Sequence, residues 1–512
     1  MTTAEAPSPG TGRTITTNIP ARLDRLPWSR WHWTIVIGLG TVWILDGLEV
    51  TVVGNIAGRL SESGSGLSIS SGQVTGTAAA LYVAGACSGA LFWGRLTDRF
   101  GRKKLFMITL MVYLAATALT AVSWEAWWFF LFRFLTGFGI GGEYAAINSA
   151  IDELIPANYR GRVDLLINGS FWLGAVGGSL LSIVALDTSL LAADVGWRLT
   201  FALGAVLALV ILLVRRHVPE SPRWLLIHGR DEEAEEIVTG IEREVERETG
   251  AALAEPQGEL EIHQRKSVSF LEIARTVFGT YTRRAVLGFS LFIGQAFLYN
   301  AITFGFGAIL TKFYDVPANH TGYYFAVIAV GNFCGPLLLG KLFDTVGRRV
   351  MISSTYLLSG LLLFGTAWLF DRGTLSAATL TACWCAVLFF ASAGASSAYL
   401  TVSEIFPMET RAMSIAFFYA LGTAAGGISG PVLFADLTGT GKVGDTVLAF
   451  SIGAALMCAA GLVAAFLAVN AERRSLEDIA RPLTAAASRA KAATKNMGPS
   501  QNPPAPPAAS RP

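Results

Sequence analysis

Two segments far apart in the chain repeat one pattern of glycines and charges. The first reads Gly94-Arg-Leu-Thr-Asp98-Arg-Phe-Gly101-Arg102-Lys-Lys104, and its counterpart, shifted by 246 residues, reads Gly340-Lys-Leu-Phe-Asp344-Thr-Val-Gly347-Arg348-Arg349. A second motif, Glu153-Leu-Ile-Pro156-Ala-Asn-Tyr-Arg160, returns 251 residues later as Glu404-Ile-Phe-Pro407-Met-Glu-Thr-Arg411. Because both motifs recur in the same order, the sequence indicates a duplicated domain, with a period too long for a solenoid.

The composition indicates the solvent that surrounds the two halves. Hydrophobic residues make up 52% of the chain, charged residues only 15%, and the mean hydropathy is +0.50, which is more apolar than a soluble globular protein. A membrane-spanning helix needs about 20 apolar residues. We therefore predict an all-helical membrane protein with twelve spans, six in each half, at 33–56, 74–94, 105–123, 126–150, 163–186, 197–215, 284–310, 321–340, 350–370, 375–401, 413–435 and 446–470.

Positive charges are distributed unevenly among the loops. Lysine and arginine concentrate before the first span, in the two repeated loops and after the last span, whereas the opposite loops carry few, chiefly Arg59, Arg198, Lys312, Arg372 and Lys442. Cytoplasmic loops are enriched in these residues. We expect both termini in the cytoplasm, and the segment before Arg30 lacks the apolar core of a cleavable signal peptide.

The predicted organisation has five parts. These are a cytoplasmic N-terminal tail (1–32), a six-helix bundle (33–215), a cytoplasmic connection (216–283), a second six-helix bundle (284–470) and a cytoplasmic tail (471–512). The connection contains acidic runs and a narrow apolar stripe, which predict short helices that can rest on the membrane domain. The Ala-, Pro- and Ser-rich tail is expected to be largely disordered.

The sequence carries no signature of an enzyme or a metal protein. Its five cysteines fall inside apolar spans without metal-ligand spacing, and neither a phosphate-binding Gly-Lys-Ser/Thr loop nor a Gly-x-Ser-x-Gly elbow is present. We expect no catalytic residues, no cofactor, no metal and no nucleic-acid partner. The expected partners are a small-molecule substrate, protons and the lipid bilayer, with the chain acting as a monomer.

The loop from Gly94 to Lys104 resembles the signature between the second and third helices of the major facilitator superfamily. Over 33–470 the resemblance implies two pseudo-symmetric six-helix bundles packed around a central cavity. Within the superfamily the chain is most similar to sugar porters and metabolite:proton symporters. The matching motifs are Pro219-Glu-Ser-Pro-Arg-Trp-Leu225 after the sixth span, Arg133 with Glu153, and Ser403-Glu404-Ile-Phe-Pro407 with Arg411.

Other positions depart from the sugar-porter pattern. Sugar porters usually have a Pro and a Tyr late in span four, where this chain has Asn148-Ser149-Ala150, and a Trp where it has Tyr399. Asp46-Gly47-Leu48-Glu49 resembles the Asp-Gly-x-acid motif of aromatic-acid:proton symporters. A sugar, a small organic acid and another metabolite therefore remain as alternative substrates.

Few ionisable residues lie inside the predicted spans, and Asp46, Glu49, Arg133 and Glu143 are the ones we consider for proton coupling. A charge at the bilayer centre costs about 2.5–3.5 kcal/mol, so such residues usually face a cavity and a partner. Glu49 and Arg133 lie at similar depth, which permits an ion pair, and the resemblance implies that Glu49 is the coupling carboxylate. The alternatives are a static pair that orients the helices and, for Glu143, a hydrogen bond to a neighbouring helix.

The repeated loops predict a cytoplasmic gate. Asp98 and Asp344 are expected to cap helix N-termini within their own halves, while the loop arginines pair with the Glu153 and Glu404 carboxylates across helix ends. Such pairs would break when the cytoplasmic side opens; the alternative is a simple topology signal. The expected gate comprises Gly94, Asp98, Arg99, Gly101, Arg102, Glu153, Arg160, Asp344, Gly347, Arg348, Glu404 and Arg411.

Polar residues in the spans of the second half are candidates for the substrate cavity, although hydrogen bonding within the core would also account for them. They are Gln295, Tyr299, Asn300, Asn332 and Tyr399. We predict a secondary active transporter of a small polar or anionic metabolite, working in the cell membrane by proton-coupled symport and alternating access. The alternatives are a proton-independent uniporter or exporter of the same fold and a transporter-like membrane receptor.

Overall fold

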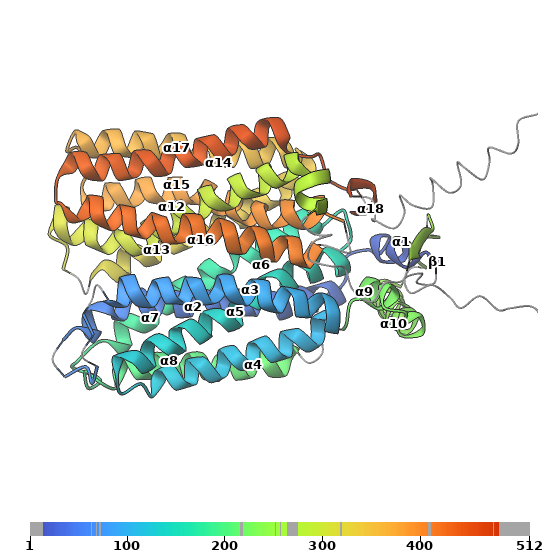
Figure 1. Cartoon of the computed structure of the whole chain (residues 1–512), viewed down its shortest axis with the longest axis horizontal. Helices are drawn as coiled ribbons and strands as arrows, with labels where there is room; N and C mark the ends of the chain where they lie inside the picture. Colours follow the sequence, from blue (N-terminus) through green and yellow to red (C-terminus); the bar gives the residue numbers. More distant parts are fainter. Residues whose placement is uncertain are drawn as a thin grey trace, which may run out of the picture.

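A computed structural model shows long, nearly parallel helices in two groups, one from each half of the chain (Figure 1). It describes residues 14–62, 64–67, 69–70, 73–215, 219–250, 252–256, 258–263, 275–317, 320–407, 411–474 and 476–480. Short helices and a small pair of strands gather at one end of the bundle, beside the repeated loops. We call this the charged end.

The first half forms six spans. They are α2 (Arg30–Leu60), α3 (Ala79–Phe100) after the π-helical turn Gln73–Ala78, α4 (Arg102–Ala121), α5 (Ala126–Leu154), α6 (Arg160–Gly169) continued by α7 (Phe171–Ala185), and α8 (Gly196–Arg215). The fifth span is interrupted at Ser170, whose hydroxyl donates to the carbonyls of Ile167 and, in α2, Gly40. Every predicted stretch of this half corresponds to one of these spans.

The second half repeats the arrangement. Its spans are α12 (Thr282–Tyr314) after the π-helical turn Thr276–Thr280, α13 (Thr321–Thr345), α14 (Arg348–Asp371), α15 (Ala377–Ile405), α16 (Arg411–Gly439) and α17 (Val443–Leu467). The pairs α2–α7, α3–α5 and α4–α8 pack closely, and so do their counterparts α12–α16, α13–α15 and α14–α17. The two six-helix bundles are therefore pseudo-symmetric, as the twofold repeat in the sequence predicts.

The outer surface is suited to lipid. Among the described residues, ten helices are long and apolar enough to cross a membrane, and α3 and α5 are the two spans outside that set. α5 carries Arg133 and Glu143 in its interior, which lowers its apolarity. Large apolar side chains such as Leu338 and Phe466 are 64% and 77% exposed, which in a membrane places them against acyl chains instead of water.

Glycines bring α3 and α5 into backbone contact. A Cβ atom added at Gly85 or Gly89 would lie 2.1 Å from a carbonyl oxygen of α5, and one added at Gly137 or Gly141 would lie 2.1 or 2.0 Å from a carbonyl oxygen of α3. No side chain fits at these positions, because the two backbones already touch. Small residues are the usual means of such close packing in membranes.

The charged end carries the short elements. β1 (Thr14–Thr17) pairs antiparallel with β2 (Leu260–His263), and α1 (Ile19–Asp24), α9 (Pro222–Ile227) and α10 (Asp231–Thr249) pack together there. α10 buries Val238, Ile241 and Val245 of the predicted apolar stripe. A last turn, α18 (Leu476–Ile479), follows α17. The tail beyond residue 480, expected to be disordered, lies outside the described residues.

Candidate functional site

The charged end holds a buried arginine–glutamate pair in each half. Arg102 Nη2 lies 2.8 Å from Glu153 Oε1, and Arg348 Nη2 lies 3.0 Å from Glu404 Oε1. Arg348 also contacts Asp344 at 2.9 Å. All of these residues are buried, so the contacts are charge-assisted hydrogen bonds shielded from water.

A glutamate that follows the last span of each half caps the helix carrying the arginine. Glu220 accepts the backbone N–H groups of Arg102 and Lys103 at 2.9 and 3.2 Å, and Glu472 accepts that of Arg348 at 3.3 Å. Both helices begin after a glycine at positive φ, and a Cβ at Gly101 would lie 2.3 Å from the Glu220 carboxylate. Burial raises the pKa of the Glu220 carboxyl, so on acidification this cap is lost at a higher pH than an exposed carboxylate cap.

Asp344 joins the two halves. Its carboxylate accepts the backbone N–H groups of Gly161 and Arg162, in the first turn of α6, at 3.1 and 2.8 Å. Our expectation that Asp344 caps a helix of its own half is wrong, because α13 packs against α6 and brings the carboxylate to an N-terminus of the other half. A second link is the 3.8 Å contact between Asp152 of α5 and Arg411 of α16.

The remaining expected gate residues take different places. Arg160 lies 3.4 Å from Asp24 of α1 and 3.9 Å from Asp152, so it belongs to this charged cluster. Arg99 is exposed, with its guanidinium 5.1 Å from the Phe100 ring centroid, and it lies apart from the buried pairs. Gly94 is buried in α3, and the side chain of Asp98 lies outside what the structure describes.

A buried ion pair lies deep in the first half. Arg133 of α5 donates to one carboxylate oxygen of Glu49 in α2, and the hydroxyl of Thr117 in α4 donates to the other at 3.0 Å. Glu49 and Arg133 are only 2% and 1% exposed. The guanidinium also lies over the Tyr82 ring, 4.8 Å from its centroid. Phe201 of α8 lies on the guanidinium as well, with its ring centroid at 5.9 Å, so residues of α2, α4 and α5 and two aromatic rings enclose this pair.

Asp46, one helical turn before Glu49, has different partners. The hydroxyls of Tyr82 and Tyr144 donate to its two carboxylate oxygens, and none of the ion pairs among the described residues includes it. Tyr82 thus connects the two sites, because its ring contacts Arg133 and its hydroxyl binds Asp46. Glu143 lies elsewhere, buried between α4 and α5, where the Thr109 hydroxyl donates to it.

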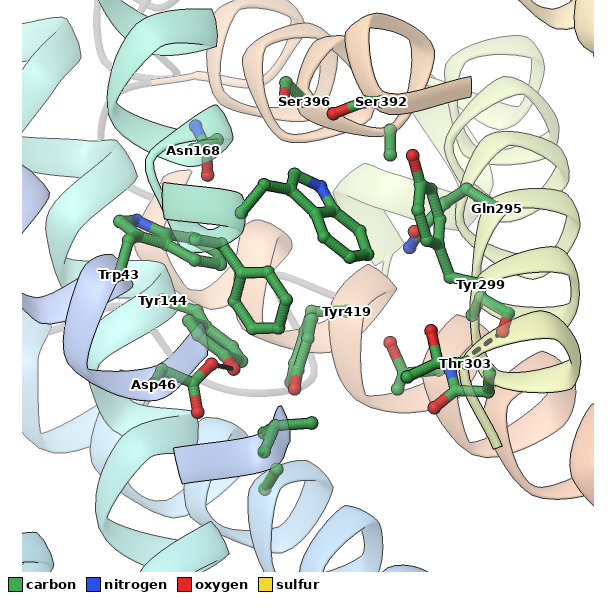
Figure 2. A pocket seen from close by; sticks show the side chains of 18 of the residues that line it. Trp43, Asp46, Tyr144, Asn168, Gln295, Tyr299, Thr303, Ser392, Ser396 and Tyr419 are labelled. Atoms are coloured by element: carbon green, nitrogen blue, oxygen red, sulfur yellow. Dashed lines mark hydrogen bonds between the residues drawn. The ribbon is translucent and has the colours of Figure 1, made fainter. Parts of the chain in front are cut away.

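Asp46 lines a central pocket of about 180 Å³ between the two halves (Figure 2). This volume is below the roughly 300–1,000 Å³ of sites for drug-sized ligands and suits a small solute. The first half contributes Trp43, Asp46, Val50, Thr51, Tyr82, Val83, Ala86, Tyr144, Asn168, Phe171 and Trp172; the second contributes Gln295, Ala296, Tyr299, Asn300, Thr303, Phe325, Ser392, Ala395, Ser396, Tyr399, Tyr419 and Thr423.

Four of the five expected cavity residues line this pocket, and the fifth, Asn332, does not. Asn332 is fully buried behind the pocket wall, where its amide oxygen accepts the Tyr299 hydroxyl at 3.0 Å. It therefore orients a lining residue. In the sequence, a polar residue that lines the pocket and one that lies behind the pocket wall look the same, because both stand in an apolar span.

The comparisons with known proteins identify the fold and the family. The family described as sugar (and other) transporters matches residues 32–483, which is most of the 512-residue chain. The chain belongs to this family. It is a membrane transporter of the major facilitator superfamily.

Curated relatives of the transporter differ in their substrates. It is 27% identical over 418 residues to the niacin transporter NiaP of Acinetobacter baylyi, which covers 81% of this chain and 89% of that protein. It is 24% identical to the 4-hydroxybenzoate transporter PcaK of Pseudomonas putida, over 89% of this chain and 97% of that protein. The putative metabolite transport protein YyaJ of Bacillus subtilis is 30% identical over 69% of this chain and 76% of its own length.

Solved structures support the same fold. The proton:xylose symporter XylE bound to 6-bromo-6-deoxy-D-glucose superposes on the transporter with a TM-score of 0.71 and 19% sequence identity, over 87% of this chain and 98% of that one. At this identity the likeness concerns the fold alone.

Apart from Tyr299 and Tyr399, sequence reasoning missed the aromatic lining of the transporter's pocket. Trp43, Tyr144, Phe171, Trp172 and Tyr419 stand in apolar spans, where an aromatic residue looks the same whether it faces lipid, core or cavity. One signal was available, since Trp43 precedes Asp46 by three residues and so shares its helix face.

Proposed function

We propose that the transporter moves a small polar metabolite by proton-coupled symport and alternating access. It works as a monomer in the cell membrane, with both termini and the connection in the cytoplasm. The observation that carries the proposal is the buried Glu49–Arg133 pair, joined to the pocket through Tyr82 and Asp46.

The pair suits a coupling role for an electrostatic reason. While Glu49 and Arg133 touch, each charge compensates the other in a region without water. A helix movement that separates them leaves an uncompensated carboxylate, which is strongly unfavourable unless the carboxylate takes up a proton. Proton uptake and helix movement are therefore linked. Tyr82 contacts both Arg133 of the pair and Asp46 of the pocket, so a change in the pocket can affect the pair.

The charged end supplies the gate of this cycle. Asp344 and the Asp152–Arg411 contact join the halves there, beside the buried arginine–glutamate pairs. In a rocking movement of one bundle against the other, these contacts must break before that end opens. The excess of basic residues at this end supports a cytoplasmic position for it.

The test is transport by Glu49→Gln in proteoliposomes. A screen of radiolabelled sugars, aromatic acids and organic cations first identifies a transported solute. Because the amide keeps the shape and cannot titrate, we expect proton-driven accumulation to be lost while counterflow of the same solute persists. Asp187→Asn, which changes an exposed carboxylate in a loop, is the matched control. Proton-driven accumulation of the solute by Glu49→Gln would contradict the coupling role of Glu49 and support Asp46 or Glu143, whereas a lack of proton-driven accumulation by the unmodified transporter would support a proton-independent mechanism.

A further inference from the structure

The pocket has an unusual balance of charge. Asp46 is the only carboxylate among its described lining residues, and no lysine, arginine or histidine is present in that set. The nearby guanidinium of Arg133 does not line the pocket and is already bound to Glu49. A solute in the pocket therefore meets one acidic group and no basic group.

The buried cluster lacks one positive charge. Asp46 and Glu49 lie one helical turn apart, and Arg133 can neutralise only one of them. The hydroxyls of Tyr82 and Tyr144 stabilise the Asp46 carboxylate, but they bring no charge. Because an uncompensated carboxylate away from water is unfavourable, a proton or a cation is needed to balance Asp46.

Aromatic rings surround the same carboxylate (Figure 2). The Tyr144 ring stacks on Trp43 with centroids 4.6 Å apart, and Tyr419 of the second half meets Tyr144 edge-on at 4.7 Å. Across the pocket, Trp172 lies 5.3 Å from Tyr299. Aromatic faces attract cations, most strongly where water is excluded, and they stack on flat rings. An anion would lose this attraction and, wherever Asp46 is ionised, be repelled by its carboxylate.

We propose that the substrate is a small organic cation with a flat ring, whose positively charged nitrogen binds Asp46 among Trp43, Tyr144 and Tyr419. The inference rests on the proposed transport function and narrows it, and it departs from the anionic alternative that the sequence allowed. In this arrangement Asp46 recognises the substrate, while Glu49 and Arg133 respond to protons. Asp46 and Glu49, both in α2, thus have different roles.

The test compares matched solutes that differ in charge. Purified full-length transporter is titrated calorimetrically at neutral pH with nicotinate, nicotinamide and the N-methylnicotinamide cation, and with phenylacetate, benzyl alcohol and benzyltrimethylammonium. We expect the cation of each series to bind at least about tenfold more tightly than the anion. Asp46→Asn should weaken cation binding by about tenfold or more and change binding of the neutral member by less than about threefold. Asp187→Asn should leave both unchanged.

Three results would overturn the proposal. They are tightest binding by the anion or the neutral member in both series, no binding of either cation at millimolar concentration, and unchanged cation affinity in Asp46→Asn. If thermal unfolding shows that Asp46→Asn is not folded, the order of solute affinities measured on the unmodified protein decides whether the proposal holds. Because these titrations use no proton gradient, they can fail while the Glu49→Gln transport test succeeds, and the reverse also holds.

Discussion

Asp46 and Glu49 show how neighbouring residues of one type differ through their partners. Both are carboxylates on one face of α2, and both are buried. Glu49 meets a guanidinium and a threonine hydroxyl between helices of its own half, whereas Asp46 meets two tyrosine hydroxyls at the pocket. One charge is neutralised within the protein and the other is not, which separates the coupling role proposed for Glu49 from the recognition role proposed for Asp46.

At this scale we predict that Arg133→Leu is strongly destabilising. It leaves Glu49 buried without its counter-ion, and breaking a buried pair in this way costs about 3–5 kcal/mol. The double variant Glu49→Gln/Arg133→Leu should recover most of that loss, because no charge then remains unpaired. Thermal unfolding of the purified variants in detergent measures both effects. A double variant no more stable than Arg133→Leu would show that the arginine acts through packing alone.

At the scale of elements, the crossing of α3 and α5 sets the position of Tyr82. Gly137 of α5 lies against the backbone carbonyl of Tyr82, so the distance between the helices is set by the absence of a side chain. Tyr82 then reaches both Arg133 and Asp46. The glycines of this crossing are structural, yet they hold in place the residue that links the two acidic sites.

We predict that Gly137→Ala lowers the stability of the transporter. Its Cβ would lie 2.1 Å from the backbone carbonyl oxygen of Tyr82. The helices would have to move apart, and overpacking of this kind usually costs about 1–3 kcal/mol. Gly365→Ala in α14 is the matched control, since no atom lies within 4 Å of its added Cβ and alanine favours helix more than glycine. Equal melting temperatures for the two variants would mean that α3 and α5 separate without cost.

For the molecule as a whole, the two bundles are joined at the charged end by few polar contacts. Asp344 bridges to the first turn of α6, and Asp152 lies near Arg411. The bundles also pack against each other through α3 with α16 and through α13 with α6 and α7. Under the proposed alternating access, the polar contacts at the charged end must break when that end opens.

We predict that Asp344→Asn shifts the transporter towards states open at the charged end. The amide removes a negative charge from the N-terminus of α6 and weakens its hydrogen bonds, at a cost of about 1–2 kcal/mol. Spin labels are attached at Lys104→Cys and Thr345→Cys, which are exposed in different halves. The distance between the two labels, measured by electron paramagnetic resonance, should then be longer. Asp371→Asn, at the far end of α14, should leave them unchanged. An unaltered distribution in Asp344→Asn would exclude Asp344 from the gate.

The sequence by itself determined the class of the protein, its twelve spans and its twofold repeat. These features depend on local properties, because about 20 apolar residues suffice to span a bilayer whatever lies beside them. The repeated motifs also pointed to acid–base pairs at helix ends, and the structure brings Arg102 to Glu153 and Arg348 to Glu404.

Only the tertiary structure decided which faces of the spans meet and what lines the pocket. A membrane helix is apolar on its lipid side and on its packed side, so hydrophobic periodicity does not show which residues face a cavity. The bridge from Asp344 to α6, the place of Asn332 behind Tyr299 and the two tyrosines on Asp46 depend on how distant helices cross. The physical reason is that solvent preference is a property of each residue, whereas a binding site is a property of the contacts between helices.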